Sequence, residues 1–171
     1  MNSGTFPSQW SWAWGQRDIK ATPLAMARVA SVAANGGYMT KTRFLLGDSI
    51  ERIRIVDEHR ADILNDYMKY TSRGHDNFKR TDIGGKTGTP EREIQNLAGK
   101  IVKANDGWYI CFFEDATVGR VENGEHVYEK SSIAVALRME RTFDGTSSMA
   151  TELMKQVVEK TLEELGYIMT R

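Results

Sequence analysis

The segment Ile83–Pro90, with the sequence IGGKTGTP, decides more about the fold and function of this chain than any other stretch. In it, Lys86 follows two glycines and precedes Thr87, Gly88 and Thr89. Ammonium groups, hydroxyls and accessible backbone N–H groups all donate hydrogen bonds to anions. The segment therefore predicts an anion-binding wall. Its glycines are typical of a strand that another backbone or a ligand approaches closely.

The phosphate loop of nucleotide-binding proteins is one alternative for this segment. That motif needs a glycine five positions before Gly85, and the position holds Arg80. A phosphate loop also leads into a helix, whereas Gly88-Thr89-Pro90 follow here. Spacing and context both argue against nucleotide binding. A glycine-rich turn with an exposed lysine remains open on these residues alone.

Composition narrows the class of protein. The chain has 171 residues, which predicts one domain or a large part of one. Its 23 basic and 23 acidic side chains give no basic excess, so we expect no nucleic-acid partner. The single cysteine, Cys111, lies in the apolar run 108–113 and is predicted to be a buried small hydrophobe. The three histidines lack metal-ligand spacing, so we expect neither a metal nor a cofactor.

Helix signals occur in three places. Thr22-Pro23 is a capping pair for a helix over 24–34, which is apolar almost all round and predicted to be buried on most sides. Asp57 is expected to begin a second helix that runs to about Thr71, with one face made of Ala61, Leu64, Met68 and Thr71. A third helix begins at Ser147 and ends before Gly166.

Strand signals follow the second helix. The pattern predicts strands over 83–89, 107–114 and 131–141, while 91–106 is polar and receives no assignment. Asn123-Gly124 predicts a two-residue hairpin that joins the last two strands into a long ribbon. Helices, then strands, then a long helix indicate an α+β fold with an antiparallel sheet.

Several segments, in the same order, resemble the transpeptidase domain of penicillin-binding proteins. Lys-Thr-Gly on a strand is one of that family's active-site elements. The Gly15-Gln16 start resembles the monofunctional, class B type. The segments that carry the resemblance are Gly15-Gln16, 22–28, 33–37, 84–89, 106–110, 132–137 and the closing helix.

The resemblance implies a partial serine β-lactamase-like fold and acyl transfer on peptidoglycan stem peptides, with β-lactams as substrate mimics. It implies that Lys86 supplies positive potential and that the Thr87 and Thr89 hydroxyls bind the substrate's terminal carboxylate. The backbone N–H of Thr89 would be one oxyanion-hole donor. Gly85 and Gly88 would let the substrate backbone approach. The family acts in the bacterial cell envelope, at the outer face of the cytoplasmic membrane.

The family's nucleophile, a serine three residues before a lysine, does not occur in this sequence. None of the ten serines has lysine at the third following position, and the Ser-x-Asn element is also missing. We therefore expect residues 1–171 to be the C-terminal portion of a transpeptidase domain whose N-terminal half is absent, and to be inactive alone. That N-terminal half is the expected partner, with a homodimer of the chain as a second arrangement.

Two other functions remain open on the sequence. One is a truncated, non-catalytic binding or interaction module of the same fold. The other is a fragment of a β-lactam sensor or a β-lactamase, since those proteins share the Lys-Thr-Gly motif.

Overall fold

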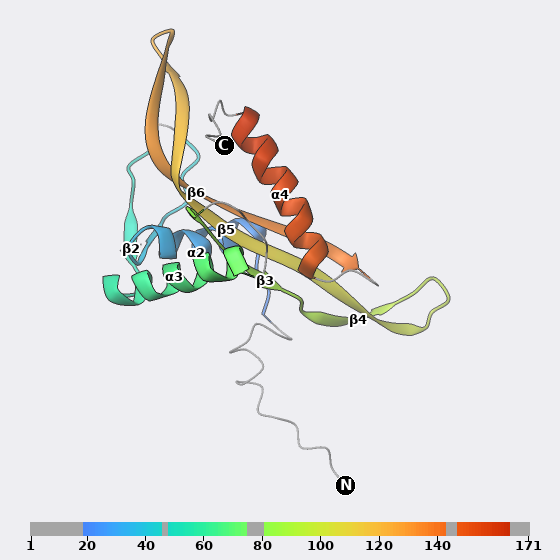
Figure 1. Cartoon of the computed structure of the whole chain (residues 1–171). Helices are drawn as coiled ribbons and strands as arrows, with labels where there is room; N and C mark the ends of the chain where they lie inside the picture. The colour runs from blue at the N-terminus through green and yellow to red at the C-terminus, as the bar shows by residue number, and fades with distance from the viewer. Residues whose placement is uncertain (1–18, 46–47, 75–80, 143–146, 165–171) are drawn as a thin grey trace.

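The expected α+β fold is confirmed by the computed structural model, which describes residues 19–45, 48–74, 81–142 and 147–164 (Figure 1). The Gly15-Gln16 start of the resemblance lies outside these residues. The helices are α2 (Pro23–Ala34), α3 (Glu58–Gly74) and α4 (Ser147–Glu164). The strands are β1 (Tyr38–Thr40), β2 (Arg52–Arg54), β3 (Ile83–Gly88), β4 (Glu91–Gln95), β5 (Ile101–Glu122) and β6 (Glu125–Thr142).

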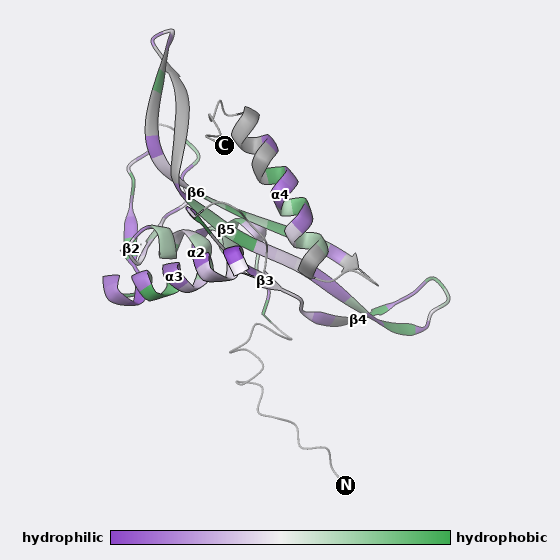
Figure 2. Ribbon diagram, viewed as in Figure 1, coloured by the Kyte–Doolittle hydropathy of each residue, from purple (hydrophilic) through white to green (hydrophobic). Residues whose placement is uncertain are grey.

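The main sheet is antiparallel and lies between two layers of helices. Strand β5 is central: β3 and β4 pair with one of its edges, and β6 pairs with the other. Helices α2 and α3 lie on one side of the sheet and α4 lies on the opposite side (Figure 1). Figure 2 shows that hydrophobic residues concentrate where β5 and β6 pass between the helices. A separate two-stranded sheet joins β1 and β2.

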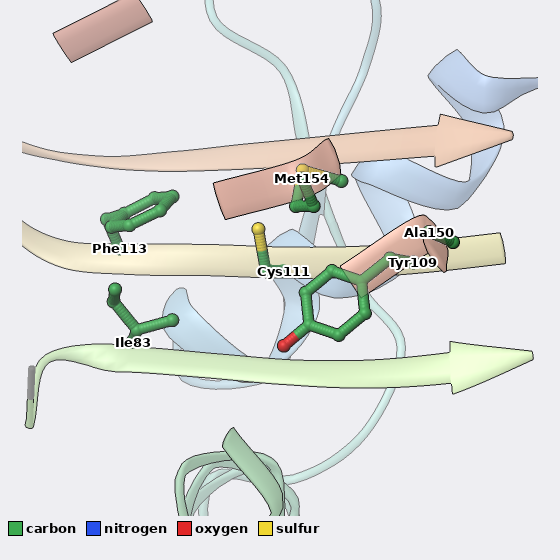
Figure 3. Packing of buried hydrophobic residues seen from close by; sticks show 6 residues of the cluster. All are labelled: Ile83, Tyr109, Cys111, Phe113, Ala150 and Met154. Carbon is green, nitrogen blue, oxygen red and sulfur yellow. The ribbon is translucent and has the colours of Figure 1, made fainter. Parts of the chain in front are cut away.

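Each side of the sheet has its own buried cluster. On the α4 side, Tyr109, Cys111 and Phe113 of β5 pack with Ile83, Ala150 and Met154 (Figure 3). On the α2 and α3 side, the Phe112 ring packs with Ala30, Ala33 and Met68. The alternation of β5 residues between the two clusters follows from the two-residue period of a strand.

Helix α2 begins as predicted. The Thr22 hydroxyl accepts a hydrogen bond from the Ala25 N–H at 3.2 Å, and Pro23 occupies the first turn. The prediction that this helix is buried on most sides is wrong, because Leu24 is 53% exposed and Val29 is 43% exposed. The buried face consists of small residues, which lets the helix lie close to the sheet.

Helix α3 begins after Asp57, whose carboxylate accepts a hydrogen bond from the Arg60 N–H at 2.9 Å. That backbone hydrogen bond, followed by contacts with the Arg60 side chain, lowers the pKa of Asp57. The predicted face of α3 is wrong by one position at two sites. Asn65 is buried in place of Leu64, which is 41% exposed, and Ser72 is buried in place of Thr71. The Asn65 amide donates to Ala33 O at 3.1 Å and to Glu114, which also pairs with Lys69.

The predicted ribbon is present and longer than expected. Asn123 has φ 51° and Gly124 has φ 85°, values of a hairpin turn that favours Asn-Gly. The strands predicted over 107–114 and 131–141 are the inner parts of β5 and β6. Residues 91–106, which had no assignment, form β4 and the start of β5 with largely exposed side chains.

Candidate functional site

Strand β3 carries the Lys-Thr-Gly motif at an edge of the main sheet. It pairs antiparallel with β5, so that Lys86 lies opposite Ile110, Thr87 opposite Tyr109 and Gly88 opposite Trp108. Strand β4 continues in the same register, with Glu91 opposite Asn105. Within the described ranges, no strand pairs with the other edge of β3. Helix α3 lies beside the first half of β3, where Ile83, Gly84 and Gly85 are buried, and Lys86 is the first exposed residue. The motif therefore lies where this strand edge becomes open.

The hydrogen-bond alternation shows which residues of β3 face that edge. The Asp106 N–H donates to Pro90 O at 3.1 Å, and the Glu114 N–H donates to Asp82 O at 3.1 Å. Backbone groups alternate in direction along an antiparallel strand, so even-numbered residues between these two points also turn toward β5. The N–H and C=O groups of Gly85, Thr87 and Thr89 consequently point away from β5. Gly85 is buried, so only Thr87 and Thr89 present these groups at the open part of the edge.

The Lys86 ammonium lies at the same edge. Its Nζ donates to Thr87 O at 2.9 Å and approaches Thr87 Oγ1 at 3.4 Å. The side chain is exposed, and none of the carboxylates in the described ranges forms an ion pair with it. A cation, an adjacent hydroxyl and outward backbone donors thus share one edge, which is chemistry suited to an anion.

Two glycines before the motif are required by packing. A Cβ atom on Gly84 would lie 2.2 Å from Phe112 Cζ, and one on Gly85 would lie 2.2 Å from Tyr109 Oη. Figure 3 shows the Tyr109 hydroxyl directed toward β3. The space beside each glycine is therefore filled by an aromatic ring of β5. Gly85 itself is buried, with Ser72 of α3 close by, so the exposed part of the edge begins at Lys86.

A hollow opens between the end of α3 and β3. Its volume is about 420 Å³, and it is lined by Tyr70, Thr71, Gly74, Lys86 and Thr87. Tyr70 is 72% exposed, and the Thr71 hydroxyl donates a hydrogen bond to Tyr67 O at 2.9 Å. Nothing in the sequence pattern indicated this hollow, because it depends on how α3 packs beside β3.

A second group missed by sequence reasoning lies where β3 passes into β4. Arg138 Nη2 donates to Asp106 Oδ2 at 2.6 Å and its Nε donates to the same oxygen at 3.3 Å. The Arg138 guanidinium also lies 5.5 Å from the centre of the Trp108 ring and 2.7 Å from Glu140 Oε1. The hydrogen bond to Asp106 raises the pKa of Arg138. Since the Asp106 N–H also binds Pro90 O, this ion pair anchors the bend that follows the motif.

Two nucleophilic side chains lie near β3, and both are buried. Cys111 is fully buried, as predicted, and burial raises the pKa of its thiol to about 12. The Ser72 hydroxyl lies 3.4 Å from Tyr109 Oη and is also fully buried. A thiol that stays protonated is a poor nucleophile, and a hydroxyl enclosed on all sides cannot reach a substrate. Neither residue can act as the attacking group.

The described part of the chain contains no group of three or more His, Cys, Asp or Glu residues suited to a metal ion. Among the same residues, no helix has the length and apolar character needed to cross a membrane.

Comparison with known proteins identifies relatives of this arrangement. Residues 2–136 match the family described as penicillin binding protein transpeptidase domain. The crystal structure of PBPA from Mycobacterium tuberculosis is similar with a TM-score of 0.58 and 25% sequence identity, over 86% of this chain and 34% of PBPA. Penicillin-binding protein 2B (PBP-2B) from Streptococcus pneumoniae strain R6 shares the fold with a TM-score of 0.54 and 13% identity, over 84% of this chain and 25% of that protein. The chain thus spans about a third and about a quarter of these two proteins. The search of curated proteins found no match.

Proposed function

Because the chain belongs to the penicillin-binding protein transpeptidase domain family, we propose that it supplies the substrate-binding wall of a peptidoglycan D,D-transpeptidase. The family match and the similar solved structures confirm the resemblance seen in the sequence. One observation carries the proposal. The backbone groups of Thr87 and Thr89 and the Lys86 ammonium all face the open part of one strand edge.

The substrate adds to this edge as an antiparallel strand. Main-chain hydrogen bonds to an exposed edge hold an extended peptide, and side-chain groups select its end. The Thr87 and Thr89 hydroxyls bind the terminal carboxylate, and Lys86 adds positive potential. Each charge-assisted hydrogen bond contributes roughly 1.5–3 kcal/mol. The open edge and the short Lys86–Thr87 contacts support these roles.

In the reaction, a serine attacks the penultimate D-Ala carbonyl, the terminal D-alanine leaves, and an amine of a neighbouring stem then attacks the acyl-enzyme. The Thr89 N–H stabilises the negative charge that develops on the carbonyl oxygen. Removing one such donor typically lowers turnover about 10²–10³-fold. The serine comes from a segment outside these 171 residues, since none of the ten serines precedes a lysine by three positions.

The partners and location follow from the same proposal. The chain acts with the polypeptide that carries the nucleophile, and β-lactams bind the completed site. Because the family acts on peptidoglycan, we place the chain at the outer face of the cytoplasmic membrane. A non-catalytic binding module of the same fold is the second candidate, and it is favoured by the burial of both Ser72 and Cys111 beside β3.

A titration of the 171-residue chain with acetyl-D-Ala-D-Ala tests the substrate wall without needing a nucleophile. In ¹⁵N–¹H NMR spectra we expect shifts at the amides of Gly85–Thr89. The peptide with a C-terminal carboxamide should bind about tenfold more weakly or worse, because a charge-assisted hydrogen bond is lost. Lys86→Met should abolish the shifts. Lys100→Met is the matched control, since Lys100 is also exposed and lies in the turn before β5.

Three results would contradict the proposal. These are equal binding of the acid and the carboxamide, an unchanged affinity in Lys86→Met, or shifts confined to residues outside β3.

A further inference from the structure

The hollow between α3 and β3 lies at one particular end of the Lys-Thr-Gly edge. It is lined on the strand side by Lys86 and Thr87, and Thr89 does not contribute to it. On the helix side, Tyr70 supplies the large side chain, while Thr71 has its hydroxyl bonded to Tyr67 O and Gly74 has no side chain. A ligand that reaches this hollow therefore meets a basic strand edge and a tyrosine ring.

Strand direction decides which end of a bound peptide reaches the hollow. A peptide that pairs antiparallel with β3 points its C-terminus toward the N-terminal half of that strand. Thr87 and Thr89 both face the open edge and lie about 7 Å apart, since each strand residue advances about 3.4 Å. A peptide with its reacting carbonyl at the Thr89 N–H therefore carries its final residue about 3.4 Å further, toward Thr87, which lines the hollow beside α3.

We propose that Tyr70 is a specificity-determining residue that bounds the site of the substrate's terminal D-residue. This inference rests on the proposed function, because that function fixes the peptide and its direction. The Tyr70 ring limits the side chain that the terminal residue can carry and packs against its methyl group when that residue is D-alanine. Aromatic rings offer a large contact area at a small cost in side-chain entropy.

The neighbouring tyrosine provides a matched control. Tyr67 lies one helical turn earlier in α3 and is 69% exposed, against 72% for Tyr70. Tyr67 is not among the residues that line the hollow. Both side chains are largely solvent-exposed, so replacement of either by alanine leaves the buried face of α3 unchanged.

The test compares two peptides, acetyl-D-Ala-D-Ala and acetyl-D-Ala-D-Leu, on three forms of the full chain: unmodified, Tyr70→Ala and Tyr67→Ala. Affinities come from the NMR shifts of the Gly85–Thr89 amides. The unmodified chain should prefer the D-Ala peptide, and Tyr70→Ala should change the ratio of the two affinities by about tenfold toward the D-Leu peptide. A pocket obtains at least about tenfold discrimination from a single methylene group, and the D-Leu side chain is larger than that of D-Ala by three carbon atoms. Tyr67→Ala should leave the ratio unchanged.

The outcomes separate this inference from the proposed function. If the D-Ala peptide shifts the Gly85–Thr89 amides and Tyr70→Ala leaves the ratio unchanged, the inference is wrong and the substrate wall stands. An equal change in Tyr67→Ala also overturns it, because the effect would then not come from the hollow. If neither peptide shifts these amides in the unmodified chain, the proposed function and the inference both fail.

Discussion

Replacing Gly84 by alanine tests the claim that β3 is held in place by an aromatic ring. The added Cβ atom would lie 2.2 Å, 2.6 Å and 2.9 Å from three atoms of the Phe112 ring. To restore ordinary contact, the ring would have to retreat by about 1.2 Å, from 2.2 Å to 3.4 Å. Phe112 is fully buried against Ala30, Ala33 and Met68, so the ring has no free space to enter.

The expected cost follows from two opposing effects. Overpacking of a close-packed core costs about 3 kcal/mol at the upper end of its usual range. Alanine restricts the unfolded chain more than glycine does, and this raises the free energy of unfolding by about 1 kcal/mol. The free energy of unfolding should therefore fall by about 2 kcal/mol. With a urea slope of about 2 kcal/mol/M, the unfolding midpoint should move down by about 1 M.

Urea unfolding followed by circular dichroism measures this change, and two further variants sharpen it. Gly88→Ala in the same strand is the matched control, because its Cβ would meet only Trp108 Cβ at 3.4 Å, so its stability should be unchanged or slightly raised. Phe112→Leu should lower the free energy of unfolding less in the Gly84→Ala background than in the unmodified chain, because the smaller side chain relieves the clash. A Gly84→Ala variant as stable as the unmodified chain, or additive effects of the two substitutions, would refute this account of the packing.

Three further predictions concern the core, the Asp106 ion pair and the missing nucleophile. Above about pH 9 the unfolded chain loses the Cys111 proton, while the folded chain keeps it to about pH 12. The unfolding free energy should therefore fall by up to about 1.4 kcal/mol per pH unit relative to Cys111→Ala. Parallel pH profiles of the two proteins would exclude this titration. Arg138→Met should lower the unfolding free energy by about 3 kcal/mol, because the Asp106 side chain is only 6% exposed and loses its guanidinium partner. Adding Asp106→Asn to this variant should recover part of that loss. An unchanged urea midpoint in Arg138→Met would show that the ion pair is not an anchor. The 171-residue chain should form no covalent adduct with a fluorescent penicillin, and a labelled band lost on substitution of one of its serines would contradict the assignment of the nucleophile to another segment.

Sequence reasoning succeeded where the deciding interactions are local. The cap at Thr22, the Asn123-Gly124 turn and the alternation of β5 and β6 each depend on a few neighbouring residues. The strand predicted over 83–89 is present as β3 and carries the Lys-Thr-Gly motif. The burial of Cys111 followed from the apolar run around it.

It failed where a residue's environment is set by distant segments. The sequence of β4 shows no alternation of apolar and polar residues, because its side chains are largely exposed and its pairing with β5 is made by backbone groups. The buried position of Asn65 could not be foreseen, because its amide is satisfied by Ala33 on another helix and Glu114 on the sheet. The hollow at Tyr70 likewise exists only because α3 packs beside β3.

The two glycines before Lys86 explain why the open edge is a rigid one. Phe112 fills the space beside Gly84 and Tyr109 fills the space beside Gly85, and these neighbouring β5 residues belong to different clusters. Strand β3 is therefore fixed by aromatic rings from both core clusters, while the backbone groups of Thr87 and Thr89 face the open part of the edge. A site held within about 0.5 Å by its supporting residues binds without first ordering its own groups. Substitutions at Phe112 or Tyr109 should thus weaken peptide binding at Thr87 and Thr89 although neither ring lies at the open edge.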